Sequence, residues 1–398
     1  MNTEHINGAR TPFYLYDIAL LRTTLDAINT EARRIPNLHV HYAVKANANP
    51  RVLAEIRDAG LGIDCVSGGE IQTVLDAGFD PAKIVFAGVG KADWEIRLAL
   101  EAGIFCFNVE SKEELEVISQ IAVKQDKVAP VCLRINPDVG AHTHDHISTG
   151  RAEDKFGIPM EDMEYVIGLC ALLPNIEFLG LHLHIGSQIL EMEDFIALAH
   201  RTNELQDRLE QQGITLRVIN IGGGLGIDYD NPNSNPVPNF HDYFAVWAEH
   251  LKLRPGQELH CEPGRAIVAQ CGSLITRVLY VKEGHEQKFV IVDAGMTELI
   301  RPALYGARHK IENITATQNL RLTDWIFPEA NTAVYDVVGP ICESTDVFAE
   351  DIVLPVTHRG DLLAIRSAGA YGETMASCYN CRPLPHGLTI DELSDTEP

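Results

Sequence analysis

The sequence lacks an excess of positive charge, a long apolar run and an apolar amino-terminal segment. Its 398 residues include 32 Lys and Arg against 56 Asp and Glu, a formal net charge of −24, which disfavours binding to nucleic acid and to anionic membranes. No clean apolar stretch reaches the roughly 18 residues of a membrane-spanning helix. The start, MNTEHINGAR, is too polar for a secretory signal. We therefore expect a cytoplasmic protein that binds neither membranes nor nucleic acid.

A disulfide framework and a metal motif are also missing. The nine cysteines are odd in number and scattered, which is typical of reduced thiols in a chain without a signal. Cys378 and Cys381 have the spacing of a redox or zinc pair, but no second pair or nearby histidine accompanies them. His142, His144 and His146 alternate, and His-x-His binds metal only with a further ligand. We expect loop residues at both places and no metal.

From residue 38 the sequence alternates short apolar runs with longer segments of helical periodicity. Apolar runs without polar alternation are typical of parallel strands that are buried on both faces. Eight such strands, each followed by a helix, favour a closed (β/α)8 TIM-like barrel over residues 31–263; a doubly wound open sheet is the alternative, and it needs fewer units. The eight runs are 38–44, 61–66, 84–87, 104–109, 131–135, 178–185, 216–221 and 258–261.

After about residue 265 the pattern changes to short strands separated by Gly, Pro and Asp, with few helices between them. A further short strand at 13–16 precedes the barrel and joins this part. We predict a second, mostly antiparallel β domain formed by 1–30 and 264–398. Its clearest strands are 273–281, 288–293, 332–338 and 362–365.

Unusual polar residues follow several of the predicted barrel strands. Lys45 follows the first strand, HIGSQ (184–188) the sixth, three glycines (222–224) the seventh, and EPGR (262–265) the eighth. Barrel enzymes build their sites at the carboxyl ends of the strands, and phosphate often binds after strands seven and eight. The glycine run lets backbone N–H groups approach an anion, although alone it is more often a flexible turn.

Lys45 and Glu262 together point to a cofactor. A lysine at a strand end is usually a solvated surface residue, but burial or charged neighbours make it a Schiff-base nucleophile. Pyridoxal phosphate needs an imine-forming lysine, an anion site and an acidic partner for its ring nitrogen. Lys45, the glycine run and Glu262 supply these three, and His184 is placed to pack on the ring.

These segments resemble a known family. YAVKAN, HIGSQ, GGGLG, EPGR, DAGM, RPALYGA, GPICESTD and AYGETMAS, followed by CYNCRP, occur in family order between about residues 12 and 383. The chain resembles the barrel-type (fold type III) pyridoxal-phosphate-dependent decarboxylases, and among these the diaminopimelate decarboxylases. This resemblance implies decarboxylation of meso-2,6-diaminopimelate to L-lysine, with pyridoxal 5'-phosphate as cofactor.

The resemblance also implies roles for single residues. Lys45 forms the Schiff base, His184 stacks on the ring, Glu262 meets the ring nitrogen, and Cys342 donates the proton that replaces CO2. The residues it assigns to the cofactor are Lys45, His184, Ser187, Gly223, Gly224, Glu262, Gly264, Arg265 and Tyr371. Those it assigns to the substrate are Arg265, Arg301, Tyr305, Glu343 and Tyr371.

Family members are homodimers in which the loop of Cys342 and Glu343 reaches the neighbouring subunit's site, so shared active sites are expected. The substrate fits the residues, because two arginines and a tyrosine suit a distal carboxylate and Glu343 suits a distal ammonium. Three alternatives stay open: a same-fold decarboxylase of carboxynorspermidine or arginine, a non-catalytic binding protein, and an aldolase that uses Lys45 without cofactor.

Overall fold

The computed structural model describes residues 6, 8–137, 155–318 and 331–395. The chain divides into two compact units. The barrel unit comprises Thr23–Gly226 and Pro238–Ile267, and the β unit comprises Met1–Arg22, Ile227–Val237 and Val268–Pro398. Within the described residues no helix is both long and apolar enough to cross a bilayer.

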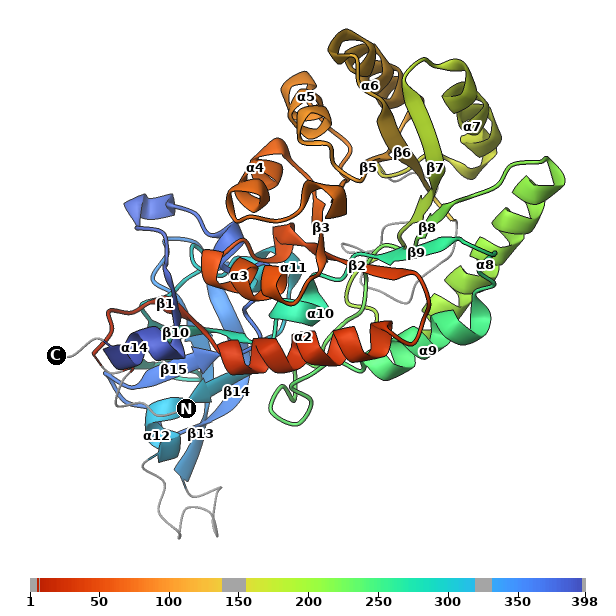
Figure 1. Cartoon of the computed structure of the whole chain (residues 1–398). Coiled ribbons are helices and arrows are strands. Elements are labelled where there is room, and N and C mark those ends of the chain that lie inside the picture. Colours follow the sequence, from red (N-terminus) through yellow and green to blue (C-terminus); the bar gives the residue numbers. More distant parts are fainter. Residues whose placement is uncertain (1–5, 7, 138–154, 319–330, 396–398) are drawn as a thin grey trace. The chain divides into compact units, whose positions relative to one another are not determined.

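Eight parallel strands close the barrel in sequence order, and helices flank them on the outside (Figure 1). The predicted barrel is therefore confirmed. The first and last strands, β2 and β9, pair with each other and close it. The strands are β2 Leu38–Ala43, β3 Gly62–Cys65, β4 Ile84–Phe86, β5 Cys106–Val109, β6 Ala129–Ile135, β7 Ile176–Leu183, β8 Val218–Asn220 and β9 Glu258–Cys261.

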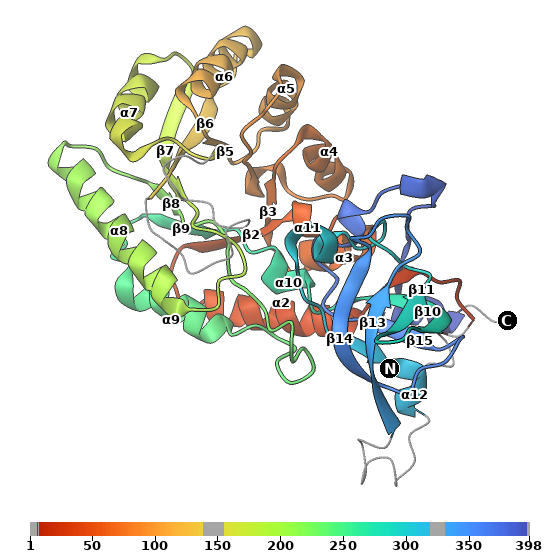
Figure 2. The same cartoon turned by 180° about the vertical axis from the view of Figure 1, so that it is seen from behind.

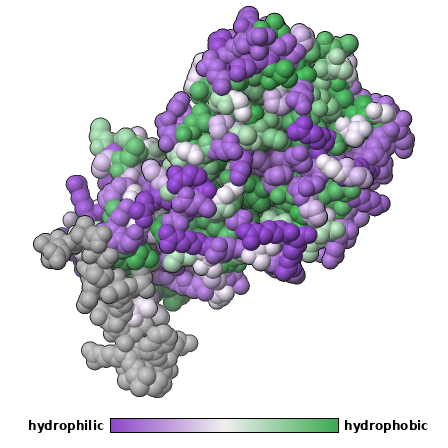
Figure 3. Space-filling view, in the orientation of Figure 1, coloured by the Kyte–Doolittle hydropathy of each residue, from purple (hydrophilic) through white to green (hydrophobic). Residues whose placement is uncertain are grey.

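The helices of the barrel begin and end where their sequences predict. Ser67 and Ser111 cap α4 and α6 by accepting hydrogen bonds from backbone N–H groups of the first turn, and Gly103 ends α5 in the left-handed conformation. Hydrophilic residues cover much of the outer helices in the view of Figure 3. The helices are α3 Pro50–Asp58, α4 Gly68–Asp76, α5 Asp93–Ala102, α6 Lys112–Gln125, α7 Met163–Leu172, α8 Met192–Gln211, α9 Phe240–His250 and α10 Arg265–Val268.

The interior of the barrel is packed with small and branched side chains. One buried cluster takes a residue from each of five neighbouring strands: Val85, Cys106, Cys132, Leu179 and Val218. The cysteines serve here as small apolar side chains, and all nine cysteines of the chain are free thiols. The barrel is thus a core and not a pore, and polar chemistry is restricted to its ends.

The β unit contains a mixed, mostly antiparallel sheet in the order β12-β15-β10-β11-β13-β14, with β1 pairing to β10 (Figure 2). The predicted strand at 13–16 is β1, and it joins this sheet as expected. The β11–β13 and β1–β16 pairs are parallel. The elements are β1 Phe13–Tyr16, β10 Gly272–Glu283, β11 Lys288–Val292, β12 Ile311–Asn313, β13 Thr332–Val338, β14 Val347–Pro355, β15 Leu362–Ile365, β16 Gly387–Thr389, and the helices α11 Arg301–Tyr305, α12 Ile314–Gln318 and α14 Ile390–Asp395.

One long helix was not predicted. Helix α2, Ile18–Ala32, begins after Asp17, whose carboxylate accepts a hydrogen bond from the Leu20 N–H. Leu21, Leu25 and Ile28 are buried along one side of it, at the spacing of an amphipathic helix. The segment between the first strand and the barrel is therefore regular structure.

Candidate active site

Lys45 lies in a single helical turn directly after β2. Its neighbours Val44 and Ala46 are buried, whereas the Lys45 side chain is 46% exposed. Gly264 packs against this turn so closely that a Cβ on it would lie 3.1 Å from the Ala43 Cβ. The turn therefore holds the lysine at the carboxyl end of the barrel, where the sequence analysis placed it.

Lys45 has a charged partner in Asp64, on the neighbouring strand β3. The Lys45 Nζ lies 3.7 Å from the Asp64 Oδ2, and the aspartate side chain is 1% exposed. Neither carboxylate oxygen has a hydrogen-bond partner among the described residues. Burial and the charge of Glu262 raise the pKa of Asp64 well above its ordinary value, against the opposing effect of Lys45. Sequence reasoning missed this group.

Glu262 follows β9 and is held by three side chains from other strands. Its Oε1 accepts hydrogen bonds from Asn108 Nδ2 (2.9 Å) and Asn220 Nδ2 (2.7 Å), and its Oε2 lies 3.0 Å from His182 Nε2. Burial alone raises the pKa of Glu262, but the charges of His182 and Lys45 and these hydrogen bonds outweigh it and lower the pKa. The group is a carboxylate with one of its four acceptor positions left for a further donor.

The glycine run is required by close packing. A Cβ on Gly223 would lie 2.3 Å from the Glu262 carbonyl oxygen, and Gly222 and Gly224 have φ values of 66° and 120°. The Gly222 N–H also donates to Asn220 Oδ1 (2.9 Å), so the same asparagine contacts both the glycine turn and Glu262. The run is a fixed turn, not a flexible one.

Two further loops meet the glycine run. The Ile189 N–H donates to the Gly224 carbonyl (2.9 Å), which joins the HIGSQ loop to the GGGLG loop. Arg265 Nη2 donates to Ser187 Oγ (3.0 Å), which joins the HIGSQ loop to the EPGR segment. The predicted phosphate-binding residues Ser187, Gly223 and Gly224 therefore belong to one connected loop system, which Arg265 joins.

His184 is half-buried beside this system. Its Nδ1 accepts a hydrogen bond from the Gly223 N–H at 3.3 Å. Burial and the charges of Arg134, Lys45 and His182 lower the pKa of His184 well below its ordinary value. A neutral imidazole suits stacking on an aromatic ring that carries a protonated nitrogen.

The remaining predicted residues lie in the β unit. Arg301, at the start of α11, is buried, and its Nη1 donates to the Tyr229 hydroxyl (2.8 Å) and to His309 Nε2 (3.1 Å). Tyr305, at the end of α11, is 39% exposed. Tyr371 has a φ of 56°, a conformation that non-glycine residues rarely adopt and that often marks functional positions.

Cys342 and Glu343 lie on one exposed loop that the CYNC segment supports. The Asn380 Oδ1 accepts a hydrogen bond from the Cys342 N–H (3.2 Å), and the Tyr379 hydroxyl donates to Glu343 Oε1 (2.7 Å). Asp346 closes the loop by accepting from the Ile341 N–H (2.7 Å). Cys378 and Cys381 are exposed free thiols that flank these two contacts.

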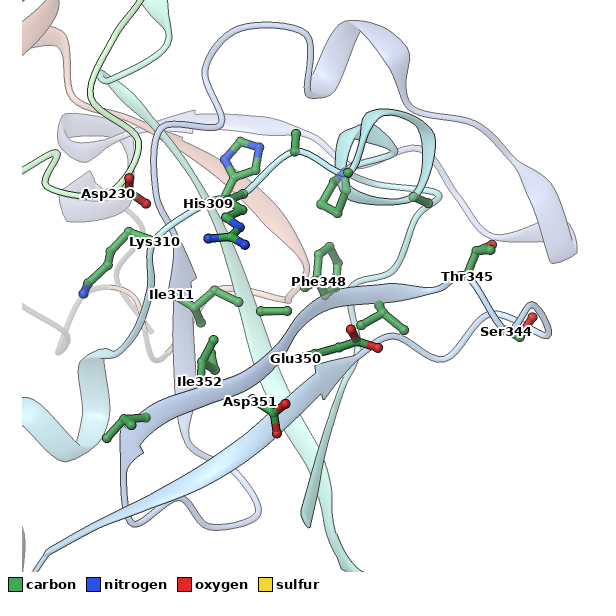
Figure 4. Close-up of a pocket in the computed structure, with 18 of the residues that line it drawn as sticks. Asp230, His309, Lys310, Ile311, Ser344, Thr345, Phe348, Glu350, Asp351 and Ile352 are labelled. Carbon is green, nitrogen blue, oxygen red and sulfur yellow. The ribbon is translucent and has the colours of Figure 1, made fainter. Parts of the chain in front are cut away.

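Close to this loop the β unit has a cavity of about 960 Å³. Ser344 and Thr345, which follow Glu343, line one side of it, and Phe348 and Glu350 of β14 line another (Figure 4). Its lining has charged side chains of both signs, but Lys45, Glu262 and the glycine run are not among the lining residues. We therefore do not place the reaction in this cavity.

The barrel residues fit pyridoxal phosphate. They provide an amine (Lys45), an ionised carboxylate with a spare acceptor position (Glu262), and loops with a serine, an arginine and backbone N–H groups, which are the groups that this cofactor requires. His142, His144 and His146 lie outside the described residues.

Comparisons with known proteins agree with this geometry. Residues 22–269 match the family model described as pyridoxal-dependent decarboxylase, pyridoxal binding domain. The chain is 62% identical over 384 residues to a diaminopimelate decarboxylase of Bacteroides thetaiotaomicron, covering 96% of each chain, and 45% identical over 381 residues to that of Pseudomonas aeruginosa, covering 96% of this chain and 88% of the relative.

A solved structure is similar over nearly the whole chain. The diaminopimelate decarboxylase of Helicobacter pylori complexed with L-lysine superposes with a TM-score of 0.89 at 39% identity, covering 98% of this chain and 94% of that one. The match to the family model and the sequence identity to relatives over nearly the whole chain are both closer than the similarity that a shared fold alone produces. The chain belongs to the pyridoxal-dependent decarboxylases and, within them, to the diaminopimelate decarboxylases.

Proposed function

We propose that this chain removes CO2 from meso-2,6-diaminopimelate to give L-lysine, the last step of lysine biosynthesis, with pyridoxal 5'-phosphate as cofactor. One observation carries the proposal: Lys45 lies beside the buried Asp64 at the barrel end where a carboxylate and the glycine loops also lie. When bound, pyridoxal phosphate supplies an aldehyde for imine formation and a ring that accepts the electrons of the broken bond.

The chain's own residues then have distinct tasks. Lys45 holds the cofactor and is needed again to release the product. While Lys45 is not bonded to the cofactor, Asp64 is the acceptor for its ammonium group. Glu262 stays ionised and keeps a proton on the ring nitrogen. Ser187, Gly223, Gly224 and the backbone at Gly264 hold the phosphate.

Substrate selection and the final proton come from other groups. Arg265, Arg301 and Tyr305 bind the distal carboxylate, which suits guanidinium geometry, and Glu343 binds the distal ammonium. Tyr371 contacts the cofactor. Cys342 delivers a proton to the carbon that has lost CO2, as a general acid.

Product identification tests this function. The purified protein with added pyridoxal phosphate is incubated with meso-diaminopimelate, L-arginine and carboxynorspermidine in turn, and CO2 and amine products are quantified. We expect CO2 and L-lysine from diaminopimelate alone, and none with Lys45→Ala. Faster CO2 release from either other substrate would contradict the assignment.

We further propose that two copies of the chain form a dimer in which Cys342 and Glu343 serve the partner's site. Both residues are exposed on a loop that Tyr379 and Asn380 hold in place, and the adjoining face of the β unit is hollow (Figure 4). A preformed loop beside a concave surface suits a symmetric interface between identical chains.

A complementation experiment tests the shared site. Lys45→Ala and Cys342→Ala variants are inactive alone, but mixing and re-equilibrating them forms hybrid dimers with one intact site. We expect about a quarter of the wild-type activity, since half of the dimers are hybrids with one working site of two. No recovered activity in a mixture whose hybrids are verified by native mass spectrometry would refute shared sites.

A further inference from the structure

A histidine cluster lies at the seam where the barrel closes. Strands β2 and β9 pair there, with His39 opposite His260. His39 and His41 are two residues apart on one strand and so face the same side of it. The His260 ring packs against both, with centroid distances of 4.8 Å to His39 and 5.0 Å to His41. The cluster lies toward the amino-terminal ends of the strands, whereas Lys45 follows the carboxyl end of β2.

Hydrogen bonds determine where the protons of this cluster lie. His41 Nδ1 is 3.1 Å from the Lys83 carbonyl oxygen, which only accepts, so Nδ1 carries a proton. His41 Nε2 then accepts, and it lies 2.8 Å from His260 Nδ1, which must donate. A neutral His260 is left with an unprotonated Nε2.

That unprotonated nitrogen faces a carboxylate. His260 Nε2 lies 3.3 Å from Glu258 Oε2, and His39 Nε2 lies 4.0 Å from the same oxygen. Imidazole nitrogen without a proton and carboxylate oxygen are both acceptors, so a pair at this distance is stabilised by a proton or a metal ion between them. Glu258 Oε1 already lies 3.7 Å from Arg217 Nε, which leaves Oε2 to the histidines.

The cation could be a proton on His260 or a metal ion. His260 is buried, with Phe105 stacked on its ring at 4.9 Å and two other imidazoles beside it. The positions of the neighbouring ligand atoms favour the metal ion.

We propose that His39 Nε2, Glu258 Oε2 and His260 Nε2 bind a zinc ion. Each of the three residues offers one ligand atom, these atoms lie within 4.8 Å of one another, and two nitrogens with one carboxylate oxygen are an established zinc ligand set. Zinc bonds of about 2.0–2.2 Å bring neighbouring ligands to roughly 3.3 Å from each other. Glu258 and His260 already have this separation, and His39, whose side chain is 52% exposed, is free to move the remaining distance.

Two features beyond the three ligands support the site. His41 accepts the Nδ1 proton of His260, which is the kind of partner that orients metal-binding histidines in other proteins. A Cβ on Gly62 would lie 2.5 Å from His41 Nδ1, so the glycine makes room for this ring. Because the ligands come from β2 and β9, the metal joins the first and last strands of the barrel. Its role is therefore structural.

The test uses the full-length protein with pyridoxal phosphate bound, after metal has been removed with a chelator. In this background protein His142, His144 and His146 are replaced by Ala, so that the other His-x-His segment does not bind zinc. Zinc titration by calorimetry should give one tight site per chain and a rise in Tm. His39→Ala and Glu258→Gln should each weaken zinc binding about 10- to 100-fold. His241→Ala removes a comparably exposed histidine and should change nothing.

Cobalt substitution separates this site from the exposed thiols. A histidine and carboxylate site gives weak visible bands, whereas Cys342, Cys378 or Cys381 would add an intense thiolate charge-transfer band. We expect no such band and unchanged decarboxylation in His39→Ala. Equal zinc affinity in the background protein, His39→Ala and Glu258→Gln, or no zinc binding by the background protein, would overturn the proposal.

Discussion

At the residue scale, Asp64 and Glu262 are both buried carboxyl groups of the barrel, but their surroundings differ. Glu262 accepts hydrogen bonds from two amides and contacts an imidazole. Asp64 has the Lys45 ammonium at 3.7 Å and no hydrogen bond among the described residues. The first arrangement stabilises the charge and the second does not, so the two groups affect stability with opposite dependence on pH.

Replacement of Asp64 by Asn should increase stability and decrease activity. The raised pKa means that the folded state holds the Asp64 proton more tightly than the unfolded chain does, so the carboxyl destabilises the fold increasingly as pH rises above about 4. Asp64→Asn should gain about 1 kcal/mol or more at pH 8 relative to pH 4, and kcat should fall at least about tenfold because Lys45 loses its acceptor. Urea unfolding and steady-state kinetics measure both. A parallel shift in the exposed Asp162→Asn control would refute the argument.

Replacement of Glu262 by Gln should change the stability of the fold with the opposite dependence on pH. Its pKa is lowered in the folded state, so the carboxylate stabilises the fold above about pH 4.3, and this contribution is lost as pH falls toward the folded-state pKa. In Glu262→Gln the amide NH2 replaces one carboxylate oxygen and faces either the two asparagine amides or His182, and the substitution should cost about 2–3 kcal/mol at pH 7. The difference from wild type should shrink on acidification below pH 4. A constant difference across the pH series would show that the carboxylate charge is not the cause.

At the element scale, the glycine turn after β8 is limited by its contact with the segment after β9. Gly223→Ala would place a Cβ 2.3 Å from the Glu262 carbonyl, and the strain should cost about 1–3 kcal/mol and weaken pyridoxal phosphate binding. Gly168→Ala, within α7, has no atom within 4 Å of the added Cβ and should gain about 0.5–1 kcal/mol. Thermal unfolding and absorbance titration compare the two. Equal stability changes would show that the close approach is unimportant.

The elements themselves could largely be predicted from sequence. Strands β1, β9, β13 and β15 have the predicted bounds, because the local hydrophobic pattern determines them. Helix α2 was missed because it precedes the alternation of strands and helices that begins at residue 38. Asp64 was missed for a different reason: it is one polar residue in a buried strand, and its importance arises from Lys45 on the next strand. Likewise, the contacts of Tyr379 and Asn380 with the Cys342 loop require the folded chain.

At the scale of the whole molecule, the formal net charge of −24 should oppose the meeting of two copies. Electrostatic repulsion reaches about 30 Å at 10 mM salt and about 8 Å at 150 mM. We therefore expect the dissociation constant of the proposed dimer to fall as NaCl is raised over this range, by sedimentation velocity. A neutral osmolyte should have no such effect. A dissociation constant that rises with salt would contradict this view of the interface.

The barrel and the β domain could both be predicted from sequence. The apolar runs repeat at regular intervals, and the motifs of the family occur in the family's order over most of the chain. The histidine cluster could not, since His39 and His260 come together only when β2 pairs with β9. A separation of this length along the sequence carries no periodic signal.

The pairing of the first and last barrel strands has a consequence for protein synthesis. Lys45 leaves the ribosome early, but Glu262 and the glycine turn are translated near the end of the barrel sequence. A nascent chain that stops before β8 has Lys45 but neither the glycine turn nor Glu262, and one that stops before the end of β9 still lacks Glu262. A chain can therefore bind pyridoxal phosphate with its full set of residues only after the whole barrel has been translated.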